Sequence, residues 1–471
     1  MPTTNGNKPL LDLMRWEICA PLPSGSTSGT TFAKVDDIHN TVWYNVSAGN
    51  NFLYSPDSDG YARCEPMGNV SFGAGSCAEG HMVGPSGTCP SNGTSTTIVT
   101  ANSLRRSLSG YKIHITGGPA AGDVRTIDTN STTGTNCSVT VTSAFSASPT
   151  TATTYRLLTP RIYSLTGSST ASTSFRVFDL ATNTVSTLAN NPISGFSECN
   201  LRATHAFRYN DFVSFATGTA TSATANTLSN SAKAWTTNQW TNQQVRITGG
   251  TGAGQIRTIS SNTGTQLTVS ANWTITPDAT STYSIEGNDD HIYVCTTAAT
   301  GLYRYSISGN TWSAALTSRA AGAGAGSNIL WPFECTNSDW TNENSIRNGR
   351  YLLSPRGAST ANIDIYDIAL NTWENSVQYV GMSGETFTTG TNWVYDRNHA
   401  YVLQDGSGRM GRIHIPDRYA EGWGTSPVTT TSSVVGNKLF IATYRDGATR
   451  INWVYSNPGS TSSLLRKMNI E

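Results

Sequence analysis

The sequence predicts an all-β protein in which repeated antiparallel units are interrupted twice by copies of a smaller β-module. Three observations support this fold class. A fifteen-residue segment occurs in two similar copies. A strand–turn–strand pattern occurs in three copies that align without a gap. Charged residues make up only 13% of the chain. This charged fraction is well below the usual quarter, and together with 44 glycines it is typical of β-rich proteins with short turns.

The repeated phrase is "IHITGGPAAGDVRTI" at 113–127 and "VRITGGTGAGQIRTI" at 245–259. A Walker loop needs a lysine after its last glycine, but aspartate follows Gly122 and glutamine follows Gly254. A dinucleotide site needs a helix directly after the glycines, whereas both phrases continue with the alternating pattern of a strand. Because glycine accepts positive φ angles, each phrase predicts a hairpin turn and no nucleotide site.

The likeness extends on both sides of the turn. "NSLRRSLSGYK" precedes the first copy and "NSAKAWTTNQWTNQ" the second, and both copies end in a threonine-rich stretch before a tyrosine. Two inserted β-modules are therefore expected at 97–158 and 218–286. Arg125 and Arg257 occupy equivalent places between β-branched residues, which predicts a solvated strand face.

The pattern "ITGGTGAGQxRTI", "LTVSxxW" and "PDATSTY" resembles a small β-unit inserted in many virion proteins of tailed bacteriophages. The likeness covers about a quarter of the chain and is closer in the second copy. The first copy departs at "GPAAGD", is longer in its "STTGTNCS" region, and has Phe145 near the place of Trp273. The resemblance implies a structural role in a phage particle.

A second repeat appears once the modules are set aside. "FRVFDLATNTV" (175–185), "LYRYSISGNTW" (302–312) and "IDIYDIALNTW" (363–373) align without a gap. The last two end 61 residues apart, and the first two end 58 residues apart when the second module is left out. A repeat of this length with a strand, a turn and a tryptophan resembles kelch-type propeller blades. Trp312 and Trp373 are therefore expected to be buried blade-core aromatics, because blades pack against one another.

Further paired strand patterns occupy 40–55, 399–415 and 437–456. Without the modules the chain has about 340 residues, which predicts a kelch-like β-propeller of about six blades, within a range of five to seven, closed by the chain ends. The predicted division is an N-terminal arm with the first propeller strands (1–96), module 1 (97–158), propeller blades (159–217), module 2 (218–286), and the remaining blades with ring closure (287–471).

Charge and hydropathy exclude several classes of protein. A net charge of zero and a pI near 7 leave no basic footprint for nucleic acid, and no apolar run is long enough to cross a membrane. The opening "MPTTNGNKPLLDLMRWEICAPLP" lacks the basic start and unbroken apolar centre of a secretory signal. We expect an arm or a short helix that ends before Pro21, with no membrane contact and no direct nucleic-acid binding.

Eight cysteines leave metal binding, disulfides and free thiols as alternatives. Cys64, Cys77 and Cys89 lie in one loop-like stretch with His81, at spacings that offer no Cys-x-x-Cys pair. Free thiols are favoured, disulfides come second and metal last, so no metal or cofactor is predicted. Cys295, inside the strand pattern "HIYVCTT", is expected in the core.

Catalysis needs an acid, a base and an orienting group, and no such set is evident. The seven histidines are scattered, and His114 is replaced by Arg246 in the sister module. The stretch "SPDSDGYA" lacks the spacing and the tryptophan of sialidase-type turns. The chain is therefore predicted not to be an enzyme.

The irregular segment "RAAGAGAGSNILWPFEC" (319–335) combines a flexible Gly/Ala run with Trp331 and Phe333. These two aromatics are candidate partner contacts, able to anchor another protein or stack on a sugar. The simpler alternative, which we favour, is that Trp331 caps a blade.

The resemblance implies a tail hub, nozzle or collar subunit in the virion, assembled in the host cytoplasm and contacting other copies of itself and other virion proteins in a symmetric ring. The alternatives are a capsid decoration or fibre protein, or a propeller that binds a glycan on the host surface. This expectation rests on analogy.

Overall fold

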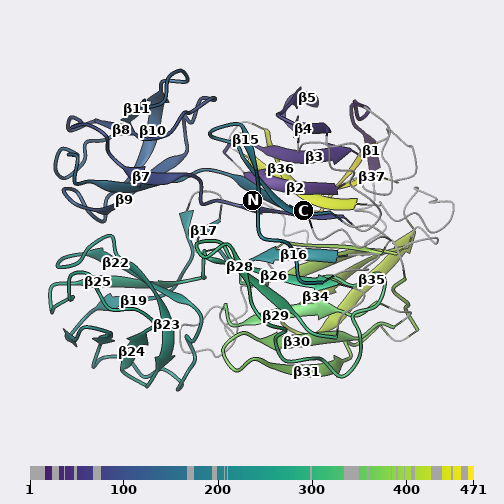
Figure 1. The fold of residues 1–471 in the computed structure, drawn as a ribbon. Helices are drawn as coiled ribbons and strands as arrows, with labels where there is room; N and C mark the ends of the chain where they lie inside the picture. Colours follow the sequence, from purple (N-terminus) through teal and green to yellow (C-terminus); the bar gives the residue numbers. More distant parts are fainter. Residues whose placement is uncertain are drawn as a thin grey trace.

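The computed structural model describes the residues in the following ranges: 16–23, 31–36, 38–46, 50–66, 76–166, 174–193, 199–205, 207–208, 211–296, 300–333, 349–357, 360–382, 384–388, 391–396, 398–404, 409–425, 438–446, 449–457 and 465–470. Within these ranges every helix or strand is a β-strand, and all paired strands in the sheets are antiparallel. The predicted all-β class is confirmed. The sheets form a propeller-like body with two further sheets beside it (Figure 1).

The propeller-like body contains six sheets, which we number I to VI in chain order. Sheet I is β2 (Thr31–Asp36), β3 (Thr41–Val46), β4 (Asn50–Ser55) and β5 (Gly60–Arg63); sheet II is β6 (Cys77–His81), β13 (Arg161–Leu165), β14 (Phe175–Asp179) and β15 (Thr184–Thr187); sheet III is β16 (Cys199–Ala203), β26 (His291–Thr296), β27 (Tyr303–Ser306) and β28 (Thr311–Trp312). Sheet IV is β29 (Tyr351–Pro355), β30 (Ile363–Asp367) and β31 (Thr372–Val377); sheet V is β32 (Asn392–Asp396), β33 (His399–Leu403), β34 (Arg409–His414) and β35 (Tyr419–Thr425); sheet VI is β36 (Lys438–Asp446), β37 (Thr449–Asn457), β38 (Arg466–Asn469) and β1 (Trp16–Ile18).

The two ends of the chain meet in sheet VI. The N-terminal strand β1 pairs with β38, with Trp16 opposite Met468. The expected short helix before Pro21 is therefore wrong for Trp16–Ile18, which are extended and paired; residues 1–15 lie outside the described ranges. Pairing the first strand with the last ones covers a sheet edge that would otherwise be open.

Each module forms one sheet of its own (Figure 1). The sheet of module 1 has the order β7 (Ser86–Thr88), β12 (Thr154–Leu158), β9 (Lys112–Gly117), β10 (Val124–Asn130), β11 (Cys137–Val141) and β8 (Thr97–Thr100). The sheet of module 2 has the order β19 (Ser214–Thr219), β25 (Thr282–Glu286), β22 (Gln244–Gly249), β23 (Ile256–Asn262), β24 (Gln266–Val269), β21 (Thr227–Ser229) and β20 (Ser222–Ala223). The shared strand order agrees with the sequence repeat, while the predicted limits of the five domains stay a prediction.

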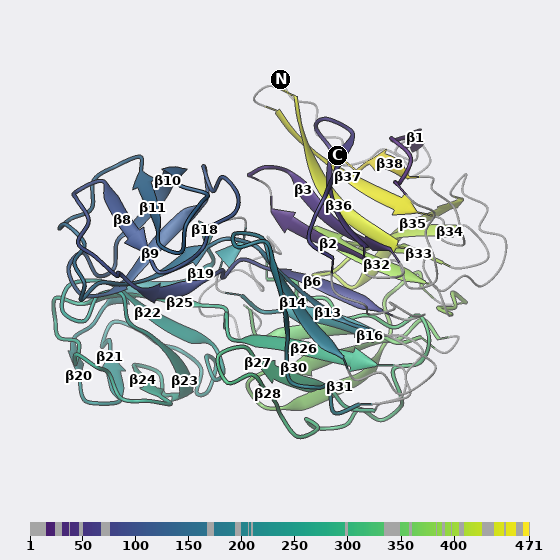
Figure 2. The ribbon, with the colours of Figure 1, turned by 45° about the horizontal axis from the view of Figure 1, so that its top comes forward.

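The modules leave the body at corresponding places. Module 1 follows β6, the first strand of sheet II, and module 2 follows β16, the first strand of sheet III. Because sheets II and III are consecutive, the two modules emerge side by side, and Figure 2 shows them adjacent on one side of the body. The short hairpin of β17 (Phe207–Arg208) and β18 (Asp211–Phe212) precedes module 2.

The gapless repeat corresponds to one recurring hairpin. In the three copies an asparagine with positive φ (Asn183, Asn310 and Asn371) makes the turn, because asparagine tolerates the left-handed region better than most residues. Tyr305 and Tyr366 donate from their hydroxyls to the Oδ1 atoms of Asn310 and Asn371, at 2.7 and 2.8 Å. The same Oδ1 atoms accept backbone N–H groups near the end of the preceding sheet, so the turn residue also links neighbouring sheets.

Trp312 and Trp373 occupy equivalent positions, opposite Tyr305 and Tyr366, with ring centroids 5.1 and 5.0 Å apart. Both indole N–H groups donate to a carbonyl just beyond the preceding sheet, Ala189 O and Thr317 O respectively. The sequence predicts that both tryptophans are buried, but in the structure each is only partly buried. They are half-buried, because each lies on the last strand of its sheet, at the edge of the propeller-like body.

Candidate functional site

A cavity of about 200 Å³ lies where the sheets of the body converge. Its wall takes one edge strand from each four-stranded sheet of the body: β2, β6, β16, β32 and β36. Next to sheet IV the wall is completed by residues between Asn328 and Phe333, which bridge to that sheet through Leu330 and Leu353. The cavity therefore lies on the axis around which the sheets are arranged.

One polar feature of this wall is a partly buried ion pair between Arg202 of β16 and Glu79 of β6. Arg202 Nη1 donates to Glu79 Oε1 at 3.1 Å, and the backbone N–H of Ala203 donates to the same oxygen. Arg202 Nε also donates to Ile329 O, so one guanidinium joins three segments of the wall. Burial raises the pKa of Glu79, and the nearby Arg202 opposes that effect. The pair stabilises the wall and leaves neither charge isolated.

A disulfide between Cys77 and Cys199 joins β6 to β16 beside this ion pair. It links sheets II and III across a sequence separation of 122 residues, and only folding brings the two cysteines together. The favoured expectation of free thiols is therefore wrong for Cys77. Cys64, Cys89, Cys137 and Cys295 are buried thiols outside this disulfide, and Cys19 is also buried; Cys335 lies outside the described ranges.

The two candidate partner contacts lie inside the protein. Trp331 is 1% exposed and Phe333 is 8% exposed, with ring centroids 4.2 Å apart. Trp331 Nε1 donates to Gly349 O and its ring meets Phe215 at the base of module 2. Both rings are buried from the outer surface but line the axial cavity, so the predicted partner contact stays a prediction, while Trp331 also fills the space between sheet and module.

The Gly/Ala run before Trp331 is also packed, which corrects the expectation of a flexible segment. Gly357 donates its N–H to Ala323 O at 2.8 Å, and a Cβ on Gly357 would lie 1.7 Å from Ala325 O. Small residues are required here because two backbone segments are in direct contact.

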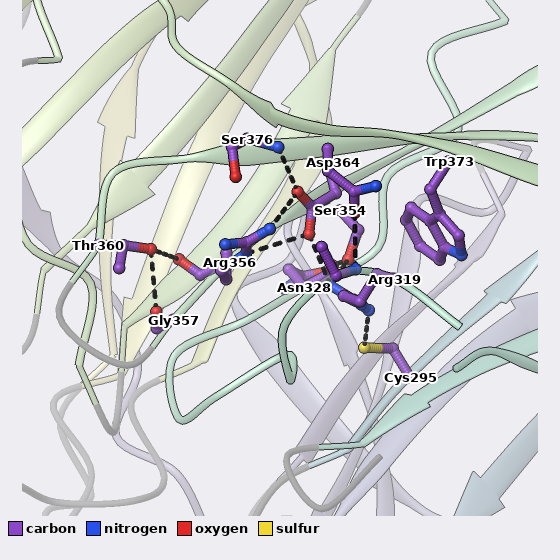
Figure 3. Close-up of polar contacts among 12 residues, drawn as sticks. Cys295, Arg319, Asn328, Ser354, Arg356, Gly357, Thr360, Asp364, Trp373 and Ser376 are labelled. Carbon is purple, nitrogen blue, oxygen red and sulfur yellow. Dashed lines mark hydrogen bonds and ion pairs between the residues drawn. The ribbon is translucent and has the colours of Figure 1, made fainter. Parts of the chain in front are cut away.

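A buried arginine–carboxylate cluster joins sheets III and IV (Figure 3). Asp364 lies between Arg356, whose Nη2 donates to it at 2.7 Å, and Arg319, whose Nη1 is 3.4 Å away. Arg319 also donates to Cys295 Sγ at 2.9 Å and lies over the ring of Trp373. Asp364 and Cys295 are fully buried, so this cluster is closed to substrates and serves to link the two sheets.

The duplicated turn forms a hairpin between β9 and β10 and again between β22 and β23, as predicted. Gly118, Gly122, Gly250 and Gly254 have positive φ angles, which explains their presence in both copies. Arg125 and Arg257, expected on a solvated face, are partly buried and tied down. Arg125 Nε donates to Ala144 O at 2.8 Å, in the loop after β11. Arg257 Nε donates to Asn272 O at 2.9 Å, in the loop after β24.

The two copies of the turn touch each other. A Cβ built on Gly122 would lie 3.0 Å from Ala253 Cβ and 3.3 Å from Thr248 O. A Cβ built on Gly254 would lie 2.9 Å from Ile115 O and 3.0 Å from the carbonyl carbon of Thr116. Any side chain larger than glycine would therefore push the modules apart.

Phe212 of β18 lies between the equivalent residues of the two modules. Its ring meets His114 of β9 edge to face at 5.7 Å and the guanidinium of Arg246 of β22 at 3.7 Å. Arg246 donates from Nε and Nη2 to Glu286 Oε1, at 3.0 and 2.8 Å, and both residues are buried. Burial raises the pKa of Glu286, against the influence of Arg246.

Histidines gather where the modules join the body. Burial lowers the pKa of His81 to about 4 and that of His291 to about 3, and it lowers the pKa of His114 well below its usual range. His114 is fully buried, neither ring nitrogen has a hydrogen-bond partner, and Arg156 and Arg246 further disfavour its charged form. These histidines are neutral at pH 7. Within the described residues, no group of three or more His, Cys, Asp or Glu side chains could hold a metal ion.

Sequence inspection missed Glu79, Arg202, Arg319, Asp364 and Cys199. Each stands alone in a strand or loop with no motif around it, and its partner is between 8 and 124 residues away. The duplicated turn was evident from the sequence, but no residue in either copy indicated that the two turns are in contact.

No family model matches the chain, and no curated protein matches it. Among solved structures, the computationally designed Ika8 protein is similar over 96% of this chain and 98% of its own, with a TM-score of 0.33 and 8% identity. A likeness at that score carries no argument about fold or function. In the described part of the chain, no helix is long and apolar enough to span a membrane.

Proposed function

We propose that this protein is a non-enzymatic structural component of a tailed-bacteriophage particle, as a tail hub, nozzle or collar subunit. Its partners in the virion are other copies of itself and other virion proteins. The observation that carries the proposal is the pair of module copies. Their sequence resembles a unit inserted in virion proteins, and they stand together as one projecting unit beside the body (Figure 2).

The proposed body is a six-bladed, kelch-like β-propeller, with sheets I to VI as its blades. The recurring Asn turn, the Tyr–Trp pair and the axial cavity lined by strands of five of the six sheets support this architecture. Ring closure by β1 and β38 removes one open edge, as expected for a propeller.

A structural role also agrees with how the ionisable groups are used. The pairs Arg246–Glu286 and Arg356–Asp364 are buried, the pair Arg202–Glu79 is partly buried, and all three join segments of the fold. A charge committed to such a pair is expensive to redirect toward a substrate. The axial cavity, at about 200 Å³, is far too small to pass a nucleic-acid strand, so any conduit would run between subunits of a ring.

The test is to identify the protein in purified phage particles by mass spectrometry and to locate it by electron cryomicroscopy. We expect several copies around a symmetry axis, with the module pair against a neighbouring subunit or another virion protein. Particles that lack the protein, or that carry isolated monomers with both modules facing solvent, would contradict the proposal.

A glycan-binding propeller is the second candidate, and the axial cavity favours it. Asn200, Asn328 and Asn392 line the cavity together with aromatic rings, which is the chemistry that sugar hydroxyls and ring faces require. Screening the purified protein on a glycan array separates the two. If the protein binds one class of sugar and Asn392→Leu abolishes that binding, glycan recognition is favoured over a purely structural role.

A further inference from the structure

The contact between the modules is made by equivalent residues in a reciprocal way. In the aligned turns Gly122 corresponds to Gly254 and Thr116 to Thr248. Gly122 approaches Thr248, and Gly254 approaches Thr116. The same two positions of the turn are therefore in contact twice, once in each direction. An interface with this property is called isologous, and it is the kind found in a two-fold homodimer.

Two further features fit this geometry. The modules have the same strand order and leave consecutive sheets after the first strand, so the chain presents them as a matched pair. Phe212 also touches His114 and Arg246, which are equivalent residues on β9 and β22. The closest approach uses backbone and Cβ atoms of the repeated turn, so it depends little on the residues that differ between the copies.

We infer that the GG-x-x-x-G turn is a pairing surface between module 1 and module 2, and that module 1 of one chain can pair through it with module 2 of a second copy of this chain. In the isolated chain the sister module fills this surface because the covalent connection gives it a high effective concentration. When the contact between the two modules of one chain opens, module 1 of that chain can bind module 2 of another chain. This inference concerns the purified protein and does not depend on its place in a particle.

Two full-length variants test it by complementation. Ala121→Arg blocks the turn of module 1, and Ala253→Arg blocks the turn of module 2, because the Cβ of Ala253 already lies at the contact and Ala121 is its counterpart. Neither chain can form the internal pair, yet the mixture contains one intact turn of each kind. In sedimentation velocity we expect a dimer fraction several-fold higher in the 1:1 mixture than in wild-type protein.

The matched controls are Ala144→Arg and Ala271→Arg, which place the same charge on exposed alanines of the same two modules. Their mixture should stay monomeric, because the internal pair is intact. Hydrogen exchange at residues 115–122 and 247–254 reports whether the blocking variants have opened the contact. A monomeric mixture with an opened contact would overturn the inference, and so would unchanged protection at both turns.

Wild-type protein provides a second route if an arginine variant fails to fold. Chains with two different affinity tags are mixed, warmed to just below their unfolding temperature and cooled. Co-purification of both tags, absent from the Ala121→Arg/Ala253→Arg double variant or its glutamate equivalent, is the expected result. Failure of the tags to exchange after warming would contradict pairing between chains. Absence of the protein from phage particles would leave this outcome unaffected.

Discussion

In module 1, strand β9 places His114 where β22 of module 2 places Arg246, and the neighbouring strands β12 and β25 pair with them in the same register. Arg246 has its counter-charge in Glu286, whereas the position equivalent to Glu286 in module 1 is Leu158, a buried apolar residue. Module 2 therefore buries Arg246 with its own carboxylate, whereas module 1 buries a neutral histidine whose cross-strand neighbour, Arg156, pairs with Asp289 instead. The comparison teaches that this position accepts either chemistry provided that both members change together, because an unpaired buried charge is far more costly than a neutral pair.

The modules also differ at the residue that closes the core. Trp273 and Phe145 are both 5% exposed, but only Trp273 can donate a hydrogen bond, from Nε1 to Thr227 O at 3.2 Å. The ring of Trp273 also receives the guanidinium of Arg257. Module 2 thus anchors its last loop with more interactions than module 1 does.

The largest expected effect follows from this anchor. Trp273→Ala should lower the free energy of unfolding of module 2 by about 4 kcal/mol, against about 3 kcal/mol for module 1 in Phe145→Ala. Tryptophans also occur throughout the propeller-like body, so hydrogen exchange of the amides in β22 and β9 at increasing urea concentration measures the stability of each module separately. Equal losses in the two variants would remove the distinction between the anchors. Loss of the whole protein's cooperative transition would show that module 2 is not a separate unit.

Glu286→Leu tests the matched change directly. The variant leaves Arg246 buried without its carboxylate and should cost about 3 kcal/mol. Adding Arg246→His gives module 2 the His–Leu combination of module 1 and should restore most of the loss. Denaturant midpoints of the single and double variants measure the coupling. If the double variant is no more stable than Glu286→Leu, the two positions do not compensate as the comparison requires.

His114→Phe should stabilise module 1, by about 1 kcal/mol at pH 8, because it removes two buried ring nitrogens without partners. The pKa of His114 is lowered in the folded protein, so only the unfolded chain takes up a proton as the pH falls below about 6.5. Wild-type stability is therefore fully present above that pH and decreases toward the folded pKa. The advantage of the variant in thermal melts should widen between pH 7 and pH 5. A constant difference would mean that His114 titrates normally.

The smallest effect is expected at the equivalent arginines. Arg125→Ala and Arg257→Ala each remove a partly exposed hydrogen bond to a loop carbonyl and should cost about 0.5 kcal/mol. Each arginine has a further polar partner, Asp123 for Arg125 at 3.0 Å and Thr274 Oγ1 for Arg257 at 2.9 Å. Arg257→Ala should cost slightly more, since Arg257 also lies over the ring of Trp273. Hydrogen exchange in the two loops measures the difference. Identical exchange in both variants would show that the additional contacts of Arg257 contribute nothing.

The sequence alone determined the strands, the hairpin turns and the repeats, because these depend on alternation and on residues such as Asn310 and Gly254 whose backbone preferences are local. The same alignment placed Trp312 and Trp373 at equivalent positions, although it could not show that the last strand of each sheet leaves them half exposed.

Only the tertiary structure decided which distant segments meet. Cys77 forms a disulfide with Cys199, and Glu79 forms an ion pair with Arg202. Trp331 packs against Phe215 at the base of module 2. All three contacts arise because sheets II, III and IV are neighbours around one axis. The contact of Gly122 with Ala253 also depends on where the two modules leave the body. A turn has the same local preferences whether it faces solvent or its own copy, so the pairing is a property of the assembled sheets and not of either sequence phrase.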